Sequence, residues 1–200
     1  ATAITLFLVP CLYLILNDRD KMSFFKEANK SDLLYSKANL EENITFVPAL
    51  TGLGAPYWEP NVRGAIFGIT RNTSKEDIIK ATIDSLSFQT LDLIKAMQKD
   101  SKIKIREMRV DGGMINNNNF LQSLSNVTQI KIIKPKNIET TSLGVAYLAA
   151  LNSGIIKNTK QIEKLWKQNK IANPKISKKK LTPLIKKWNK TIKVLITLNS

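Results

Sequence analysis

The most informative segment of this 200-residue chain is Met108-Arg109-Val110-Asp111-Gly112-Gly113-Met114-Ile115-Asn116-Asn117. Apolar residues alternate with charged ones between Lys102 and Val110, which predicts a strand. The two glycines end that strand. A helical spacing follows at Phe120, Leu121, Leu124 and Val127.

A strand, a Gly-Gly turn and a helix start together suit a ligand that approaches bare backbone. Glycine has no Cβ and reaches positive φ freely. A helix start offers unpaired N–H groups and the positive end of the helix dipole. We therefore take Gly112 and Gly113 as a candidate ligand-binding turn. An ordinary tight turn is the alternative, because Gly-Gly before a helix is a weak motif.

The composition excludes several kinds of site. Hydrophobic residues make up 43% of the chain, which is enough for a core. The single cysteine, Cys11, allows neither a disulfide framework nor a cysteine-type zinc site. Histidine is absent, which removes histidine-based triads, histidine metal ligands and histidine general bases.

The positive charge is concentrated near the C-terminus. Of the net charge of +15, residues 157–200 carry +12, from thirteen lysines and one acid, Glu163. Surfaces that bind nucleic acid usually add arginine and stacking aromatic residues. This segment has no arginine, and its only large aromatics are Trp166 and Trp188. We therefore favour a solvated helical face over a nucleic-acid-binding surface.

The first sixteen residues form an uncharged apolar run. The run is shorter than the roughly 20 residues that a spanning helix needs, and it contains Pro10. No basic region precedes it, as one would in a signal peptide. We expect no membrane span. Because the chain begins with Ala1 rather than methionine, we also expect a fragment of a longer protein.

Strands alternate with helices between residues 45 and 154, which predicts an α/β layer structure. We expect strands over 45–50, 64–70 and 130–135 and a loop over 51–58, which Tyr57 and Trp58 would anchor by burial. Residues 73–76 (Thr-Ser-Lys-Glu) predict a capping box that starts a helix running to about Gln98. Its predicted core stripe is Ile79, Ile83, Leu86, Thr90, Leu93 and Met97.

Two further helical regions are predicted downstream. Thr140 or Thr141 is expected to cap a helix whose small residues allow close helix packing, and residues 152–154 are expected to close it. Over 159–200 we expect helices joined by a loop that contains Lys, Pro174 and Pro183.

Several of these segments resemble the FGGY family of carbohydrate kinases, and in particular its glycerol kinases. Residues 46–58 and 63–71 match the glycerol kinase pattern, and Gly64 to Asp84 resembles the second family signature. Residues 109–113 and 139–144 fit the same family without gaps. The resemblance extends from Arg19 to about residue 155, and more weakly to Trp188.

The resemblance implies an actin-like, ribonuclease H-like ATPase fold and an ATP-dependent glycerol kinase that forms sn-glycerol 3-phosphate. The resemblance covers only the C-terminal domain of these enzymes. It implies that this domain contributes adenosine contacts, here through Gly112, Gly113 and Asn117. An asparagine can both donate and accept there. The catalytic base, the phosphate-binding turn and the Mg²⁺ ligands would belong to the missing N-terminal half. We therefore assign no catalytic residue to this chain and interpret Asp111 as holding the turn.

The same resemblance sets the expected partners: ATP, Mg²⁺ and glycerol in a cytoplasmic, homo-oligomeric parent enzyme that binds no nucleic acid. Another FGGY kinase, such as one for a pentulose, is the alternative. The run Gly52-Leu53-Gly54-Ala55-Pro56-Tyr57-Trp58 favours glycerol.

Three divisions of the chain follow. Residues 19–155 are expected to form the ATP-binding domain, and residues 156–200 a basic helical extension of it. Residues 1–18 are anomalous, because Leu12 and Leu16 stand where the family has a Gly and a Gln that contact ATP. We expect residues 1–18 to be a mistranslated or displaced stretch.

Overall fold

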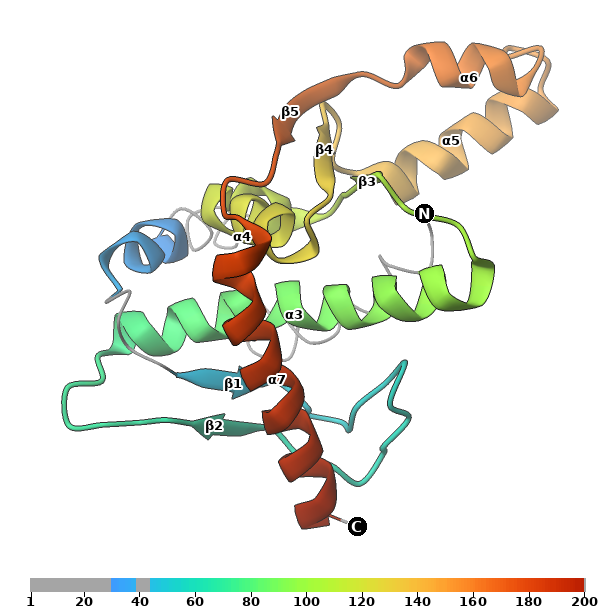
Figure 1. Cartoon of the computed structure of the whole chain (residues 1–200). Coiled ribbons are helices and arrows are strands. Elements are labelled where there is room, and N and C mark those ends of the chain that lie inside the picture. The colour runs from blue at the N-terminus through green and yellow to red at the C-terminus, as the bar shows by residue number, and fades with distance from the viewer. Residues whose placement is uncertain (1–29, 39–43, 200) are drawn as a thin grey trace.

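The computed structural model describes residues 30–38 and 44–199 (Figure 1). The predictions for residues 1–18, including those for Leu12 and Leu16, lie outside the described residues. A helix over residues 30–37 comes first. It is followed by β1 (Thr45–Val47), β2 (Ala65–Phe67), α3 (Lys75–Ser101), β3 (Glu107–Arg109), the 3₁₀ helix η1 (Gly113–Asn116), α4 (Asn118–Thr128), β4 (Lys131–Pro135), α5 (Thr140–Asn152), α6 (Thr159–Leu165), β5 (Gln168–Ala172) and α7 (Lys178–Asn199).

Helix α3 is the centre of the arrangement (Figure 1). The antiparallel pair β1–β2 lies on one side of it, and α4 with the sheet β3-β4-β5 lies on the other. Strands β3 and β4 are parallel, with Met108 opposite Ile132, whereas β5 runs antiparallel to β4. The predicted α/β class is confirmed, although β1, β2 and β3 are shorter than the predicted strands.

The capping box of α3 lies one residue later than predicted. Ser74 is the N-cap, and its hydroxyl accepts from the Asp77 amide at 3.2 Å. The Asp77 carboxylate accepts in return from the Ser74 amide at 2.9 Å. The predicted cap, Thr73, instead accepts from the Thr70 amide at 2.8 Å, so its hydroxyl serves the preceding turn.

The two largest core clusters lie on either side of α3. One joins α3 and α4 to the three-stranded sheet through residues such as Leu86, Leu124 and Ile132. The other joins β1 to α7 through Val47 and Trp188. Of the predicted stripe, Ile83, Leu86 and Thr90 are buried, since α3 has a buried face toward each of these clusters. Met97 is exposed because the last turns of α3 extend beyond both clusters.

The loop over 51–58 is held by one of its two aromatics. The Tyr57 hydroxyl donates to Asp92 on α3 at 2.8 Å, as an anchor should. The prediction that Trp58 is buried is wrong, since this side chain is 68% exposed. Glycine is required at position 52 for steric reasons, because a Cβ there would lie 2.7 Å from the Pro60 Cα.

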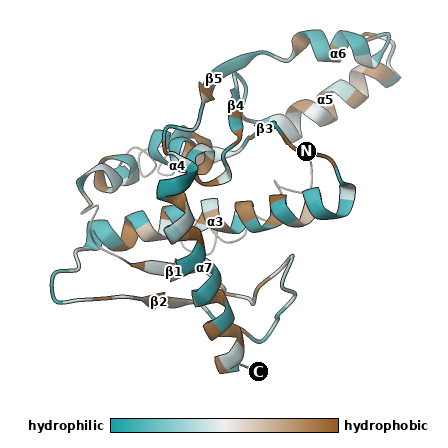
Figure 2. Ribbon diagram, viewed as in Figure 1, coloured by the Kyte–Doolittle hydropathy of each residue, from teal (hydrophilic) through white to brown (hydrophobic). Residues whose placement is uncertain are grey.

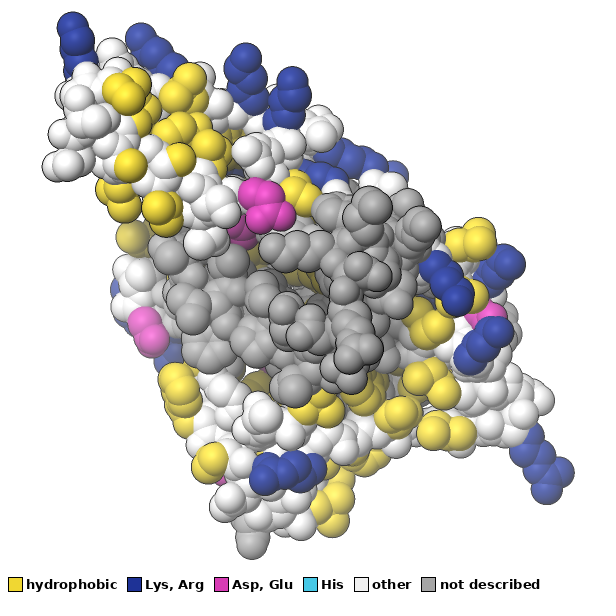
Figure 3. All heavy atoms as spheres, turned by 180° about the vertical axis from the view of Figure 1, so that it is seen from behind, with side chains coloured by type: hydrophobic (Ala, Val, Ile, Leu, Met, Phe, Trp, Pro, Cys, Tyr) yellow, Lys and Arg dark blue, Asp and Glu magenta, His cyan; other side chains and the backbone are white. Residues whose placement is uncertain are grey.

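Helix α5 differs from its prediction. Its N-cap is Glu139, without a side-chain capping bond, so Thr140 is the first helical residue and not the cap. The expected close packing is not found among the described residues, since none of the α5 residues is buried. Helix α5 contains hydrophobic residues along its length (Figure 2). Apolar side chains are therefore exposed on α5 and α6 (Figure 3), including Val145, Leu148 and Leu165.

The C-terminal region contains a strand that was not predicted. Residues 168–172 (Gln-Asn-Lys-Ile-Ala) lack an apolar alternation, and pairing with β4 makes them a strand. The predicted loop ends earlier than expected, since Pro183 lies inside α7. Among the described residues no helix combines the length and apolarity that crossing a membrane requires.

Candidate nucleotide-binding turn

The Gly-Gly turn lies at the carboxyl end of the parallel strands β3 and β4. Strand pairing continues past β3 through the Val110 amide, which donates to the Ile133 carbonyl at 3.1 Å. The Gly112 amide then donates to the Ile138 carbonyl at 3.4 Å, and η1 begins at Gly113. Ligands of open α/β sheets bind beyond this edge. The turn predicted from sequence is therefore at the end of the sheet where a ligand is expected.

The backbone conformation at position 112 requires glycine. Its φ of 89° and ψ of 172° fall in a region that is essentially restricted to glycine. A Cβ built there would meet no atom of the described residues within 4 Å. Among the described residues, the space beside Gly112 is thus open, which is what a ligand against the backbone needs.

Asn117 is fully buried and already has two partners. Its Oδ1 accepts from the Phe120 amide at 2.7 Å, which makes it the N-cap of α4. Its Nδ2 donates to the Ser31 hydroxyl at 2.9 Å. An N-cap side chain of this kind stabilises a helix by about 0.5–2 kcal/mol. Asn117 therefore fixes the start of α4 just after the turn, and a nucleotide contact by this side chain stays a prediction.

The start of α4 is less open than the sequence indicates. The Asn119 amide donates to the Asp32 carboxylate at 2.8 Å, and the Asn119 side chain donates to the Asp32 carbonyl at 2.8 Å. A carboxylate from the helix over 30–37 thus already occupies the positive end of α4. The expectation of unpaired N–H groups is wrong for Asn119 and Phe120, and we infer that an anionic phosphate is disfavoured at this helix end.

Sequence reasoning missed Asp32, since no local pattern connects it with a residue 87 positions away. Asp111, directly before the turn, is partly buried. Its expected role in holding the turn stays a prediction.

The other border of the turn is basic. The Lys134 ammonium donates to Asn116 Oδ1 at 2.7 Å, and Lys170 lies opposite Lys134 across the β4–β5 pair. Burial, followed by the charge of Lys170, lowers the pKa of Lys134. The Asn116 Nδ2 is buried without a hydrogen-bond partner among the described residues. This border therefore offers donors to an electron-rich ligand group.

The described residues contain no group of three or more His, Cys, Asp or Glu side chains that would hold a metal ion. What the turn provides is backbone at Gly112 and Gly113, an asparagine cap and a basic border.

The chain is similar to known proteins in both sequence and fold. The family model described as the C-terminal domain of the FGGY family of carbohydrate kinases matches residues 13–153. A glycerol kinase of Pediococcus pentosaceus is 43% identical over 174 residues, which is 87% of this chain and 34% of that protein. The chain therefore spans about a third of the length of this relative.

Solved structures agree in fold. The crystal structure of Plasmodium falciparum glycerol kinase with ADP matches with a TM-score of 0.76 and 29% identity, covering 88% of this chain and 35% of that one. A ligand-bound xylulose kinase from Lactobacillus acidophilus matches with a TM-score of 0.69 over 88% of this chain and 39% of its own. At 22% identity, the latter likeness concerns the fold alone.

Proposed function

Because the chain belongs to the FGGY family of carbohydrate kinases, whose C-terminal domain it matches, we propose that it forms the nucleotide side of an ATP-dependent glycerol kinase. The observation that carries this proposal is the 43% identity to a glycerol kinase over 87% of the chain. The reaction transfers a phosphoryl group from ATP to glycerol and gives sn-glycerol 3-phosphate and ADP. By the same resemblance, the parent enzyme is cytoplasmic and homo-oligomeric.

The turn fits the uncharged part of ATP better than its phosphates. Gly112 leaves open space beside the backbone, and Gly113 follows it directly as the first residue of η1. Asp32 disfavours a phosphate at the start of α4. We therefore assign adenosine contacts to Gly112 and Gly113. Asn117 would add a contact through the Nδ2 hydrogen that Ser31 does not use.

The phosphoryl chemistry is assigned to the other domain of the enzyme. Phosphoryl transfer depends on a base or positioning group, on Mg²⁺ and on clamping of the phosphates. We place the Mg²⁺ ligands and the base outside this chain, in the N-terminal half that the family resemblance implies. Residues 19–155 then form the ATP-binding domain, and residues 156–200 extend it through β5 and α7. The 200-residue chain alone should not phosphorylate glycerol.

Two other functions have less support. A pentulose kinase would share the fold, but the xylulose kinase match is only 22% identical. A nucleic-acid-binding role would need exposed aromatics beside the lysines. Trp188 is 1% exposed, and Arg109 stacks on Trp166 at 4.2 Å, so neither ring is free to stack on a base.

A domain exchange tests the proposal. The matching 174 residues of the Pediococcus glycerol kinase would be replaced by the corresponding part of this chain. We expect the chimaera to produce ADP in the presence of glycerol. A matched Gly113→Val chimaera should lose ATP affinity, because its β-branched side chain would fill the space beside the turn. A folded chimaera that forms no ADP with glycerol would refute the proposal.

A further inference from the structure

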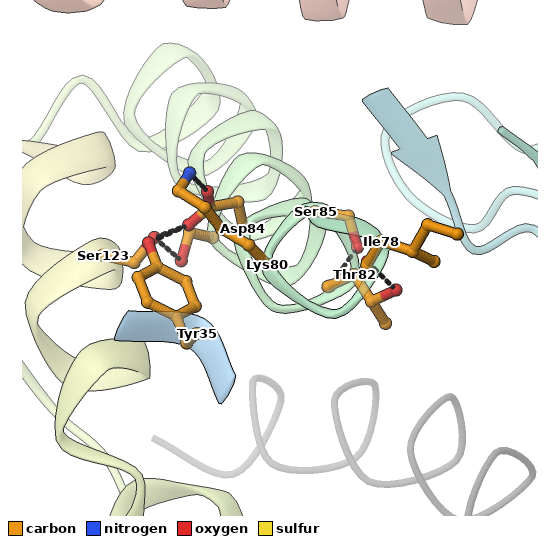
Figure 4. A network of polar contacts seen from close by, with 8 residues as sticks. Tyr35, Ile78, Lys80, Thr82, Asp84, Ser85 and Ser123 are labelled. Carbon is orange, nitrogen blue, oxygen red and sulfur yellow. Dashed lines mark hydrogen bonds and ion pairs between the residues drawn. The ribbon is translucent and has the colours of Figure 1, made fainter. Parts of the chain in front are cut away.

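Three segments far apart in the sequence meet at one carboxylate, Asp84 (Figure 4). Its Oδ1 accepts from the Tyr35 hydroxyl at 2.7 Å and from the Ser123 hydroxyl at 2.6 Å. Its Oδ2 pairs with the Lys80 ammonium at 2.5 Å. Tyr35 belongs to the helix over 30–37, Ser123 to α4 and Asp84 to α3. One side chain therefore joins three helices.

The Tyr35 hydroxyl is a dependable donor in this network. Burial, followed by the negative charge of Asp84, raises the pKa of Tyr35 far above its usual value. Lys80 also lies 5.3 Å from the centre of the Tyr35 ring, so the ion pair and the ring support one another. Hydrogen bonds to a charged acceptor are stronger than neutral ones, and this one fixes the helix over 30–37 against α3.

The helix over 30–37 also contacts the residues that follow the candidate nucleotide turn. It does so through side chains that lie one helical turn before Tyr35. Ser31 and Asp32 accept from Asn117 and Asn119 at the start of α4, and Tyr35 lies four residues after Ser31. Residues four apart share a helix face. The face that contacts Asp84 is therefore the face that caps α4.

We infer that Asp84 is a positioning residue for the nucleotide turn, acting through Tyr35 and the helix over 30–37. Tyr35 holds this helix in place, Ser31 and Asp32 then hold Asn117 and Asn119, and these set where the Gly112–Gly113 turn ends. Asp84 reaches α4 a second time through Ser123, which also accepts from the Ser87 hydroxyl at 3.1 Å. Assigning ATP to the turn rests on the proposed function, but the positioning does not.

Amide hydrogen exchange on the 200-residue chain tests the positioning directly. Tyr35→Phe removes one hydroxyl and should speed exchange about tenfold or more over residues 30–37 and at the amides of Asn119 and Phe120, since a lost bond worth about 1.4 kcal/mol is a tenfold change. The matched control is Tyr57→Phe, which removes another tyrosine–aspartate bond, to Asp92. This control should leave both regions unchanged and loosen the loop near residue 57.

A second variant separates charge from shape. Asp84→Asn keeps an acceptor for Tyr35 and Ser123 but loses the pairing with Lys80, so it should have a smaller effect on exchange than Asp84→Ala. Unchanged exchange at Asn119 and Phe120 in Tyr35→Phe would overturn the inference, as would a change confined to residues 30–37.

The functional consequence is measured in the chimaeric kinase. Tyr35→Phe should raise the KM for ATP severalfold while the KM for glycerol stays constant, because the turn is loosened and the glycerol contacts lie elsewhere. An unchanged KM for ATP, together with faster exchange at Asn119, would overturn the role at the nucleotide site. An inactive unsubstituted chimaera would count against the proposed function only, since the exchange experiment needs no activity.

Discussion

Helices α4 and α5 each follow a parallel strand of the same sheet, yet only one of them is packed. Helix α4 has four large apolar residues in its eleven and buries all four of them. Helix α5 has eight apolar residues in its thirteen, counting alanines and Tyr147, and buries none. Helix α4 lies against α3, whereas α5 buries no residue against any described element. Apolar composition thus indicates that a helix can be buried, but burial also requires a neighbouring element that packs against it.

The largest effect is expected in the packed helix. Leu124 is 0% exposed, between α3 and the sheet. Leu124→Ala should lower the free energy of unfolding by about 2–5 kcal/mol, through lost burial and the cavity left behind. Urea unfolding followed by circular dichroism measures this. A loss below 1 kcal/mol would mean that α4 is not packed as described.

Helix α7 extends the comparison, because it is rich in lysine and nevertheless packed. Trp188 is buried, stacks on Phe88 at 5.4 Å and donates to Asp92 at 2.6 Å. Trp188→Phe keeps the aromatic ring but removes the donor to a buried carboxylate. The expected loss of stability is about 1.5–3 kcal/mol, and a calorimetric scan that shows no drop in Tm would contradict it.

Asn117→Ala tests the start of the packed helix. The cap to Phe120 and the bond to Ser31 are both lost, so unfolding should become easier by about 1–2 kcal/mol. In the chimaeric kinase this variant should also weaken the binding of ATP more than the binding of glycerol. Equal losses for both ligands, or none for ATP, would argue against the nucleotide assignment.

The pH dependence of stability probes the second core cluster. Burial raises the pKa of Asp92, and the bonds from Trp188 and Tyr57 only partly offset this. The native state therefore holds the Asp92 proton to a higher pH than the unfolded state does. The contribution of Asp92 to stability should fall as pH rises above about 4.

Asp92→Asn isolates this effect, because asparagine does not titrate. The stability of the variant relative to the original chain should be more favourable at pH 7 than at pH 4, as measured by urea midpoints. The same relative stability at both pH values would show that Asp92 does not titrate differently on folding.

The smallest effect on stability is expected in α5. Leu148 is 69% exposed, so Leu148→Lys should change the free energy of unfolding by less than about 0.5 kcal/mol. Its solubility should rise, because an exposed apolar patch shrinks. A loss comparable to that of Leu124→Ala would show that α5 is buried in solution and would remove the contrast between the helices.

Sequence alone predicts the turn and α4 well, because two glycines and a regular apolar spacing are local signals. It does not predict Asp32 at the start of α4, since that partner comes from 87 residues away. Strand β5 was missed for a similar reason: its residues have no strand pattern, and β4 supplies the pairing. The capping box was misplaced by one residue because residues 73–77 offer two overlapping candidates, and only the turn at Thr70 selects between them.

The distance between Asp92 and Trp188, 96 residues along the chain, has a consequence during synthesis. On the ribosome, Asp92 and the inner side of β1 emerge long before α7 does. Until then, Val47 and Phe88 lack the indole that covers them, and the carboxylate lacks one of its donors. Nascent chains that stop before residue 188 should therefore expose this surface to chaperones and proteases until α7 completes this part of the core.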